Sequence, residues 1–157
     1  MPDIEQLLAA AEPREESVRV CLDGSATTEI ADLRDELAGL DDWQPTSLAD
    51  TDPRTELRAR VEALRQAAAD ASVEFRFRAL GHRAFSALVA AHPPAPGSSS
   101  LYDEATFLPA LLAACCVSPT LSPGQVDLLL DRVSYGTAQQ LFDTALAVNE
   151  EPSPVPF

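Results

Sequence analysis

The sequence contains no lysine, and all eleven of its basic residues are arginine. Its 25 acidic residues give a formal net charge of −14 and a pI near 4.3. A chain with this charge repels the phosphates of nucleic acids, so the composition disfavours binding to DNA or RNA. The same charge is compatible with an acidic protein that imitates DNA.

Cysteine and histidine are also scarce, with three and two residues. The odd cysteine count and the adjacency of Cys115 and Cys116 disfavour the disulfide framework of a secreted domain. On a helix, adjacent side chains point about 100° apart, which suits buried thiols better than a shared tetrahedral zinc ion. His82 and His92 fall where a helix is expected to begin and end, and no nucleophile motif surrounds any Ser or Cys. We therefore expect no catalytic residue, no metal and no cofactor; a small hydrolase is the disfavoured option.

Long apolar runs are missing, and none reaches the roughly 20 residues that a helix needs to cross a bilayer. The acidic start of the chain does not resemble a signal peptide, so we expect a cytoplasmic protein. A length of 157 residues with 46% hydrophobic residues suits one domain with a core of its own. We expect a flexible N-terminal segment at 1–16, a single mainly helical domain at 17–149, and a disordered, Pro-rich acidic tail at 150–157.

Two segments alternate between apolar and polar residues, as strands with one buried face do. The first covers 18–22, and the second is 73–79, in which Phe75 and Phe77 alternate with Arg76 and Arg78. A lone strand is unstable, so we expect the two to pair across the intervening helices, with helices covering one face. The predicted fold is mainly α (α+β): a helical domain with a small two-stranded β element packed against helices.

The rest of the chain has helical spacing of its apolar residues. The segment from Phe107 is apolar almost all round, which predicts that the helix at 103–117 is the most buried element. Ser122 before Pro123 is typical of a helix N-cap followed by proline at the first helical position. The helices expected with bounds are 2–11, 54–71, 82–91, 103–117 and 137–149, and others pass through Ile30, Leu33, Leu37 and Leu40 and through Val126, Leu129, Leu130 and Val133.

Basic charge is concentrated in one region. Residues 53–92 contain seven arginines and four acids, whereas 1–52 and 93–157 are strongly acidic. This region either balances the charge of the acidic N-terminal third or forms a docking surface for an acidic partner or another copy of the protein. The single tryptophan is expected to pack back on the core, with an exposed anchor as the alternative. The candidate protein-binding residues are Arg58, Arg65, Arg76, Arg78 and Trp43.

Three stretches together resemble a known family. They are VRVCLDGSATTEIADLRDEL at 18–37, VEFRFRALGHRAFSALVAAHPP at 73–94, and FLPALLAACCVSPTLSPGQVDLLLDRVSYGTAQQLFDTALAVN at 107–149. In pattern, order and spacing they are similar to the tail assembly chaperones of long-tailed (siphovirus-type) phages and prophages of high-GC actinobacteria. The family has no catalytic motif, and it has no residue-level binding motif that could be carried over to positions of this chain.

The resemblance implies a protein that binds the tape measure protein, keeps that long helical chain soluble, and helps recruit subunits of the major tail tube protein. Such a chaperone acts in the host bacterial cytoplasm and is not retained in the mature virion. Many of these genes also yield a longer product by programmed frameshifting, so a frameshift-extended form and a second copy are further candidate partners; nucleic acid and membrane are not. The alternative is an acidic DNA mimic that inhibits a host nuclease or restriction enzyme. A mimic needs acids in rows about 7 Å apart, whereas here they concentrate in the N-terminal third and in loops.

Overall fold

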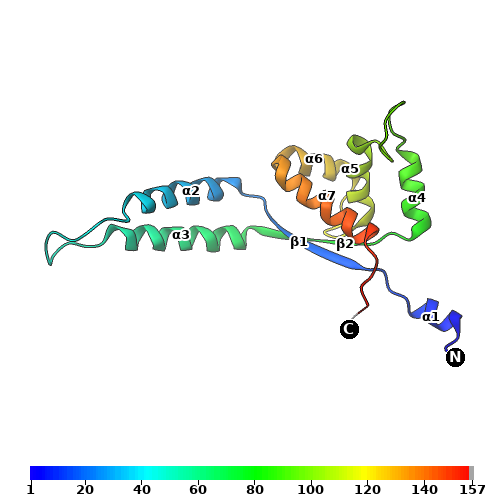
Figure 1. Cartoon of the computed structure of the whole chain (residues 1–157), viewed down its shortest axis with the longest axis horizontal. Helices are drawn as coiled ribbons and strands as arrows, with labels where there is room; N and C mark the ends of the chain where they lie inside the picture. The colour runs from blue at the N-terminus through cyan, green and yellow to red at the C-terminus, as the bar shows by residue number, and fades with distance from the viewer. Residues whose placement is uncertain (156–157) are drawn as a thin grey trace. The chain divides into compact units, whose positions relative to one another are not determined.

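The structure of the chain is a computed structural model that describes residues 1–155. Within them the chain forms seven helices and a small three-stranded antiparallel sheet, and 57% of it is helical (Figure 1). This confirms the predicted mainly helical class. Pro156 and Phe157, which belong to the predicted tail, lie outside the described residues.

The chain divides into two compact units. One consists of Met1–Val18 together with Glu74–Phe157, and the other is Arg19–Val73. The domain boundaries predicted from the sequence follow a different division, and they stay predictions.

The sheet has the order β1-β2-β3, with β1 at Glu15–Cys21, β2 at Ser72–Arg78 and β3 at Cys116–Ser118. The predicted pairing of the first two strands is confirmed, although β1 begins at Glu15, inside the segment predicted to be flexible. Along β2, two phenylalanines are buried and the charged residues between them are exposed, as the alternation predicts.

The prediction of only two strands is wrong, because β3 lies where the sequence predicts the end of the helix at 103–117. Helix α5 ends at Cys115, and the next three residues are extended and pair with β2, with Phe77 opposite Cys116 and Arg76 opposite Ser118. Ser118 precedes Pro119, and a residue before proline is pushed out of the helical region toward extended backbone. Pro119 accounts for the extended backbone of Ser118, and Cys116 is extended where it pairs with Phe77 of β2.

Helices α4 (His82–Ala91), α5 (Glu104–Cys115), α6 (Pro123–Arg132) and α7 (Tyr135–Glu150) follow β2 in the same unit. Helix α5 packs against the other three and contributes more buried side chains than any other described helix, as predicted. Pro109 lies inside α5 rather than in its first turn. The largest fully buried side chains of this core are Phe77, Phe107, Leu111, Leu112, Cys115, Val126, Leu141 and Val148.

Side-chain caps are found at the start of α5, α6 and α7. Ser122 and Gln125 form a reciprocal capping box at the start of α6, with Pro123 at the first helical position as predicted. Ser134 caps α7 by accepting from the Thr137 backbone N–H, so this helix begins two residues before the predicted 137. Near the N-terminus, α1 (Ile4–Ala10) is capped by Asp3, and none of its residues is buried.

In the other unit, α2 (Gly24–Gly39) and α3 (Pro53–Asp70) lie side by side, joined by residues 40–52 (Figure 1). Its buried apolar side chains on the two helices are only Ala26, Leu33 and Val61. An ion pair between Arg60 Nη2 and Glu29 Oε1, at 2.5 Å, also links the two helices. This hairpin is therefore held by a thin apolar seam and by polar contacts at its edges.

Candidate protein-binding surfaces

The predicted arginines of β2 lie on the exposed face of the strand, beside Glu74. Both Nε and Nη2 of Arg78 lie 2.8 Å from Glu15 Oε1 on the neighbouring strand β1. Within residues 1–155, Arg76 has no ion-pair partner. An exposed ion pair of this kind contributes only about 0–1 kcal/mol, so Arg78 could exchange Glu15 for a carboxylate on a partner.

The surface beside this ion pair is hollowed by a cavity of about 530 Å³, lined by Glu12, Pro13, Glu15 and Arg78. The lining has two carboxylates and one guanidinium, and that guanidinium is already bound to Glu15. The hollow is therefore net acidic, which suits a basic group of a partner better than the acidic partner predicted for this surface.

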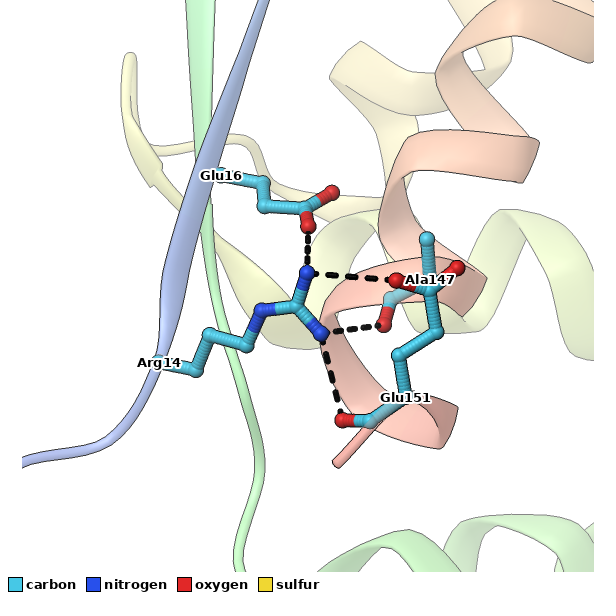
Figure 2. A network of polar contacts seen from close by, with 4 residues as sticks. All are labelled: Arg14, Glu16, Ala147 and Glu151. Carbon is cyan, nitrogen blue, oxygen red and sulfur yellow. Dashed lines mark hydrogen bonds and ion pairs between the residues drawn. The ribbon is translucent and has the colours of Figure 1, made fainter. Parts of the chain in front are cut away.

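Arg14, which the sequence did not single out, joins the residues before β1 to the end of α7 (Figure 2). Its Nη1 donates to the carbonyl oxygens of Ala147 at 3.5 Å and Glu151 at 3.2 Å, and its Nη2 pairs with Glu151 Oε2 at 3.2 Å and with Glu16. The Ala147 carbonyl already accepts from the Glu151 backbone N–H at 3.1 Å, so Arg14 is its second donor. A cation at this place also satisfies the Glu151 carbonyl at the end of the helix and offsets the negative end of the helix dipole. Arg14 therefore caps α7, whose last residues are acidic.

Asn149 strengthens the same connection. Its Oδ1 accepts from the backbone N–H of Leu80 at 2.7 Å, just after β2, and its Nδ2 donates to the Ala145 carbonyl at 2.7 Å. The backbone N–H of Ala79 donates to the Arg14 carbonyl at 2.8 Å. The end of α7 is thus tied to the chain on both sides of the β1–β2 pair. Sequence periodicity carries no signal for such contacts between distant segments.

The predicted arginines of α3 are exposed. The arginine that pairs with Glu62 is Arg65, at 4.0 Å, three residues further along the helix. Helical spacing alone also allows Glu62 to pair with Arg58, four residues earlier, because neighbours three and four residues apart face the same residue about equally closely. Arg58 has no ion-pair partner within residues 1–155.

Trp43 is half-buried and lies under an arginine. The guanidinium carbon of Arg54 is 5.7 Å from the centre of its ring, a cation–π distance. Asp52 holds that guanidinium through bonds to Nε and Nη2, at 3.0 and 2.9 Å. The hydrogen bonds with Arg54 lower the pKa of Asp52 and raise the pKa of Arg54. Trp43 is thus neither buried in a core nor a freely exposed anchor, the two alternatives considered for it.

Next to Trp43, one carboxylate closes a tight turn. Asp50 Oδ2 accepts from the Thr46 backbone N–H at 2.7 Å, the Thr46 hydroxyl at 2.7 Å and the Ser47 backbone N–H at 2.8 Å. The hydroxyl bond, followed by the two backbone bonds, lowers the pKa of Asp50. At the apex of this turn the Leu48 side chain is fully exposed.

Two of the thiols and one imidazole take structural places. Burial raises the pKa of the Cys115 thiol to about 12, with a smaller contribution from Cys116, whose own pKa burial also raises. His92 is half-buried; its Nδ1 lies 3.0 Å from the Thr106 hydroxyl, and its ring meets Phe107 edge to face. Among residues 1–155, no group of three or more His, Cys, Asp or Glu side chains is arranged to hold a metal ion.

The five predicted protein-binding residues divide between the two units. Arg76 and Arg78 belong to the unit with the helical core, and Arg58, Arg65 and Trp43 belong to the α2–α3 hairpin.

Comparison of the chain with family models, with curated proteins and with solved structures finds no match. No helix in residues 1–155 has the length and apolar character needed to cross a membrane.

Proposed function

We propose that this chain is a phage tail assembly chaperone. In this role it binds the tape measure protein in the host cytoplasm, keeps that protein soluble, and helps recruit tail tube subunits around it without remaining in the mature particle. The observation that carries the proposal is the resemblance of three sequence blocks, at 18–37, 73–94 and 107–149, in the order and spacing of that family.

The places of the blocks in the fold support this reading. All eight of the largest fully buried side chains fall within 73–94 or 107–149. The resemblance therefore includes positions that determine the packing of the helical unit. The first block coincides with most of β1 and α2.

The surface chemistry fits a protein that works by binding. Exposed arginines on β2 and α3 lie on an otherwise acidic molecule, and Arg58 and Arg76 have no ion-pair partner among the described residues. Such side chains can pair with carboxylates of a helical partner, while the net charge of −14 keeps a complex with a poorly soluble chain in solution.

The test is co-expression with the tape measure protein encoded in the same genome. We expect the soluble fraction of that protein to rise and a complex of the two to survive gel filtration. The control is an unrelated acidic protein of similar size and charge, which separates specific binding from a general effect of charge. A tape measure protein that stays as insoluble as with the control contradicts the proposal, and inhibition of a nuclease by the chain would instead favour the acidic DNA mimic.

A further inference from the structure

Strand β1 forms an open edge of the sheet. In the order β1-β2-β3 it has a neighbouring strand on one side only, and it is seven residues long. Among residues 1–155, no backbone N–H or carbonyl of this strand forms a hydrogen bond outside the sheet. A strand edge of this length, with backbone groups that have no partner, can pair with a further strand.

The contact between β1 and β2 indicates which residues of β1 face the open side. The Ala79 backbone N–H donates to the Arg14 carbonyl at 2.8 Å, just beyond the ends of the two strands. In an antiparallel ladder, a strand bonds to its neighbour through every second residue. Counting from Arg14, the backbone groups of Glu15, Ser17 and Arg19 therefore point away from β2. The side chains of these three residues are also exposed.

The sequence of this edge is complementary to itself. When two copies of β1 run antiparallel about a two-fold axis at Ser17, Glu15 of each copy lies opposite Arg19 of the other. Side chains directly opposite one another in an antiparallel pair are close enough to interact, and opposite charges there are favourable. An axis at Val18 instead places Glu15 opposite Cys21 and matches no charges. Charge therefore selects the pairing centred on Ser17.

The hollow beside β1 offers a place for the arginine of a second copy. Its lining of Glu12, Pro13, Glu15 and Arg78 carries two carboxylates and one guanidinium, so the hollow is net acidic. Arg19 is exposed and has no ion-pair partner among residues 1–155. Brought opposite Glu15 of a second copy, this arginine balances the charge of the hollow.

We propose that two copies of this chain associate edge to edge through β1, in an antiparallel pair centred on Ser17 in which Glu15 of each copy meets Arg19 of the other. The contact uses one short strand from each copy and is smaller than a standard interface, so we expect a dissociation constant on the order of 10–100 µM. Below that range the chain is a monomer, and stability measured there describes the single chain. The inference does not depend on the proposed function, because it concerns the chain alone.

Sedimentation equilibrium of the purified full chain, at concentrations on both sides of this dissociation constant, measures the association. The mean mass should rise from that of one chain, 16.8 kDa, toward twice that value. Arg19→Glu places two carboxylates opposite each other at both ends of the contact, and Glu15→Arg does the same with two guanidinium groups. Each variant alone should self-associate roughly tenfold or more weakly. Mixed in equal amounts, the two variants should associate with each other, because every acid then meets an arginine.

Arg76→Glu is the matched control. Arg76 is also an exposed arginine without an ion-pair partner in residues 1–155, but it lies in β2, which has a neighbouring strand on each side. The substitution changes the net charge by the same amount as Arg19→Glu. It should change the dissociation constant by less than about twofold, because salt screens charges that do not meet in the contact.

Each other outcome has a definite meaning. A wild-type chain that stays a monomer at every concentration overturns the proposal. A dimer that Arg19→Glu and Arg76→Glu weaken alike responds only to net charge, which also overturns it. If Arg19→Glu and Glu15→Arg fail to associate when mixed, these two residues do not meet and the edge pairing is wrong. None of these results depends on whether the chain binds a tape measure protein.

Discussion

Replacing Leu111 with alanine tests the central place of α5 in the fold. Leu111 has 0% exposure and lies in the helix that packs against α4, α6 and α7. Its neighbours Phe107, Leu112 and Cys115 are also buried, so neither solvent nor a mobile surface side chain can fill the space left behind. The substitution should therefore leave a cavity that relaxes little.

The expected cost follows from that geometry. Leu→Ala substitutions in cores cost about 2–5 kcal/mol, the larger values occurring where the surroundings cannot collapse. We expect about 3–4 kcal/mol for Leu111→Ala, a fall in thermal midpoint of roughly 6–16 °C for a chain of this size. The matched control is Leu128→Ala in α6, where the side chain is 61% exposed. The control should change the free energy of unfolding by less than about 0.5 kcal/mol.

The assay is urea unfolding followed by circular dichroism, with amide hydrogen exchange to locate the effect. The loss should appear as a lower urea midpoint and as faster exchange in α5, α6 and α7. A cost below about 2 kcal/mol for Leu111→Ala, or equal costs for Leu111→Ala and Leu128→Ala, would refute the reasoning. Either result would mean that α5 does not lie at the centre of the helical unit.

Three further outcomes are expected. Arg14→Gln should lower the thermal midpoint by about 2–4 °C and speed amide exchange at the end of α7, because it removes the cap of that helix. The control Arg19→Gln, at an exposed arginine without an ion-pair partner in residues 1–155, should change neither quantity. Equal effects of the two substitutions would exclude the capping role of Arg14. Truncation after Glu151 should move the midpoint by less than about 2 °C, since residues 152–155 are exposed and the contacts of Glu151 with Arg14 remain. Between about pH 9 and 12 the free energy of unfolding should fall as pH rises, because the unfolded chain releases the Cys115 proton near pH 9 while the folded chain holds it to about pH 12. In thermal melts, the Cys115→Ala variant should lose stability less steeply with pH than the wild type. An equally steep loss in both proteins would contradict the burial of this thiol.

The parts of the fold that were predicted correctly depend on local signals. The alternation in β2 identifies which face is buried, because side chains point to opposite faces in turn. Ser122 and Pro123 determine where α6 begins, and the apolar surface of α5 determines its burial. Both signals lie within one or two helical turns of the feature that they predict. For these elements, neighbours in the sequence are also the neighbours that determine the structure.

The missed features depend on contacts between distant segments or on a competition between two local signals. β3 is three residues long, and its pairing with β2 outweighs a helical pattern that continues through Val117. Arg14 meets Glu151 across the whole length of the chain, which no periodicity reveals. The choice between Arg58 and Arg65 for Glu62 depends on rotamers and not on spacing.

The candidate surface was predicted in composition but not in arrangement. Counting charges located the arginines, and the structure distributes them over two units. The turn around Leu48 could have been noticed, because a Thr-Ser pair followed by Asp within four residues is typical of side-chain-closed turns. Exposure of the leucine, however, is a property of the fold and is not visible in the sequence.

The measurement that tests the central claim most directly is gel filtration with light scattering of the chain mixed with purified tape measure protein. If the chain is a tail assembly chaperone, the two proteins elute together with a mass equal to a whole-number combination of their own masses, and the complex persists at physiological salt. Two separate peaks at the masses of the free proteins would contradict the account.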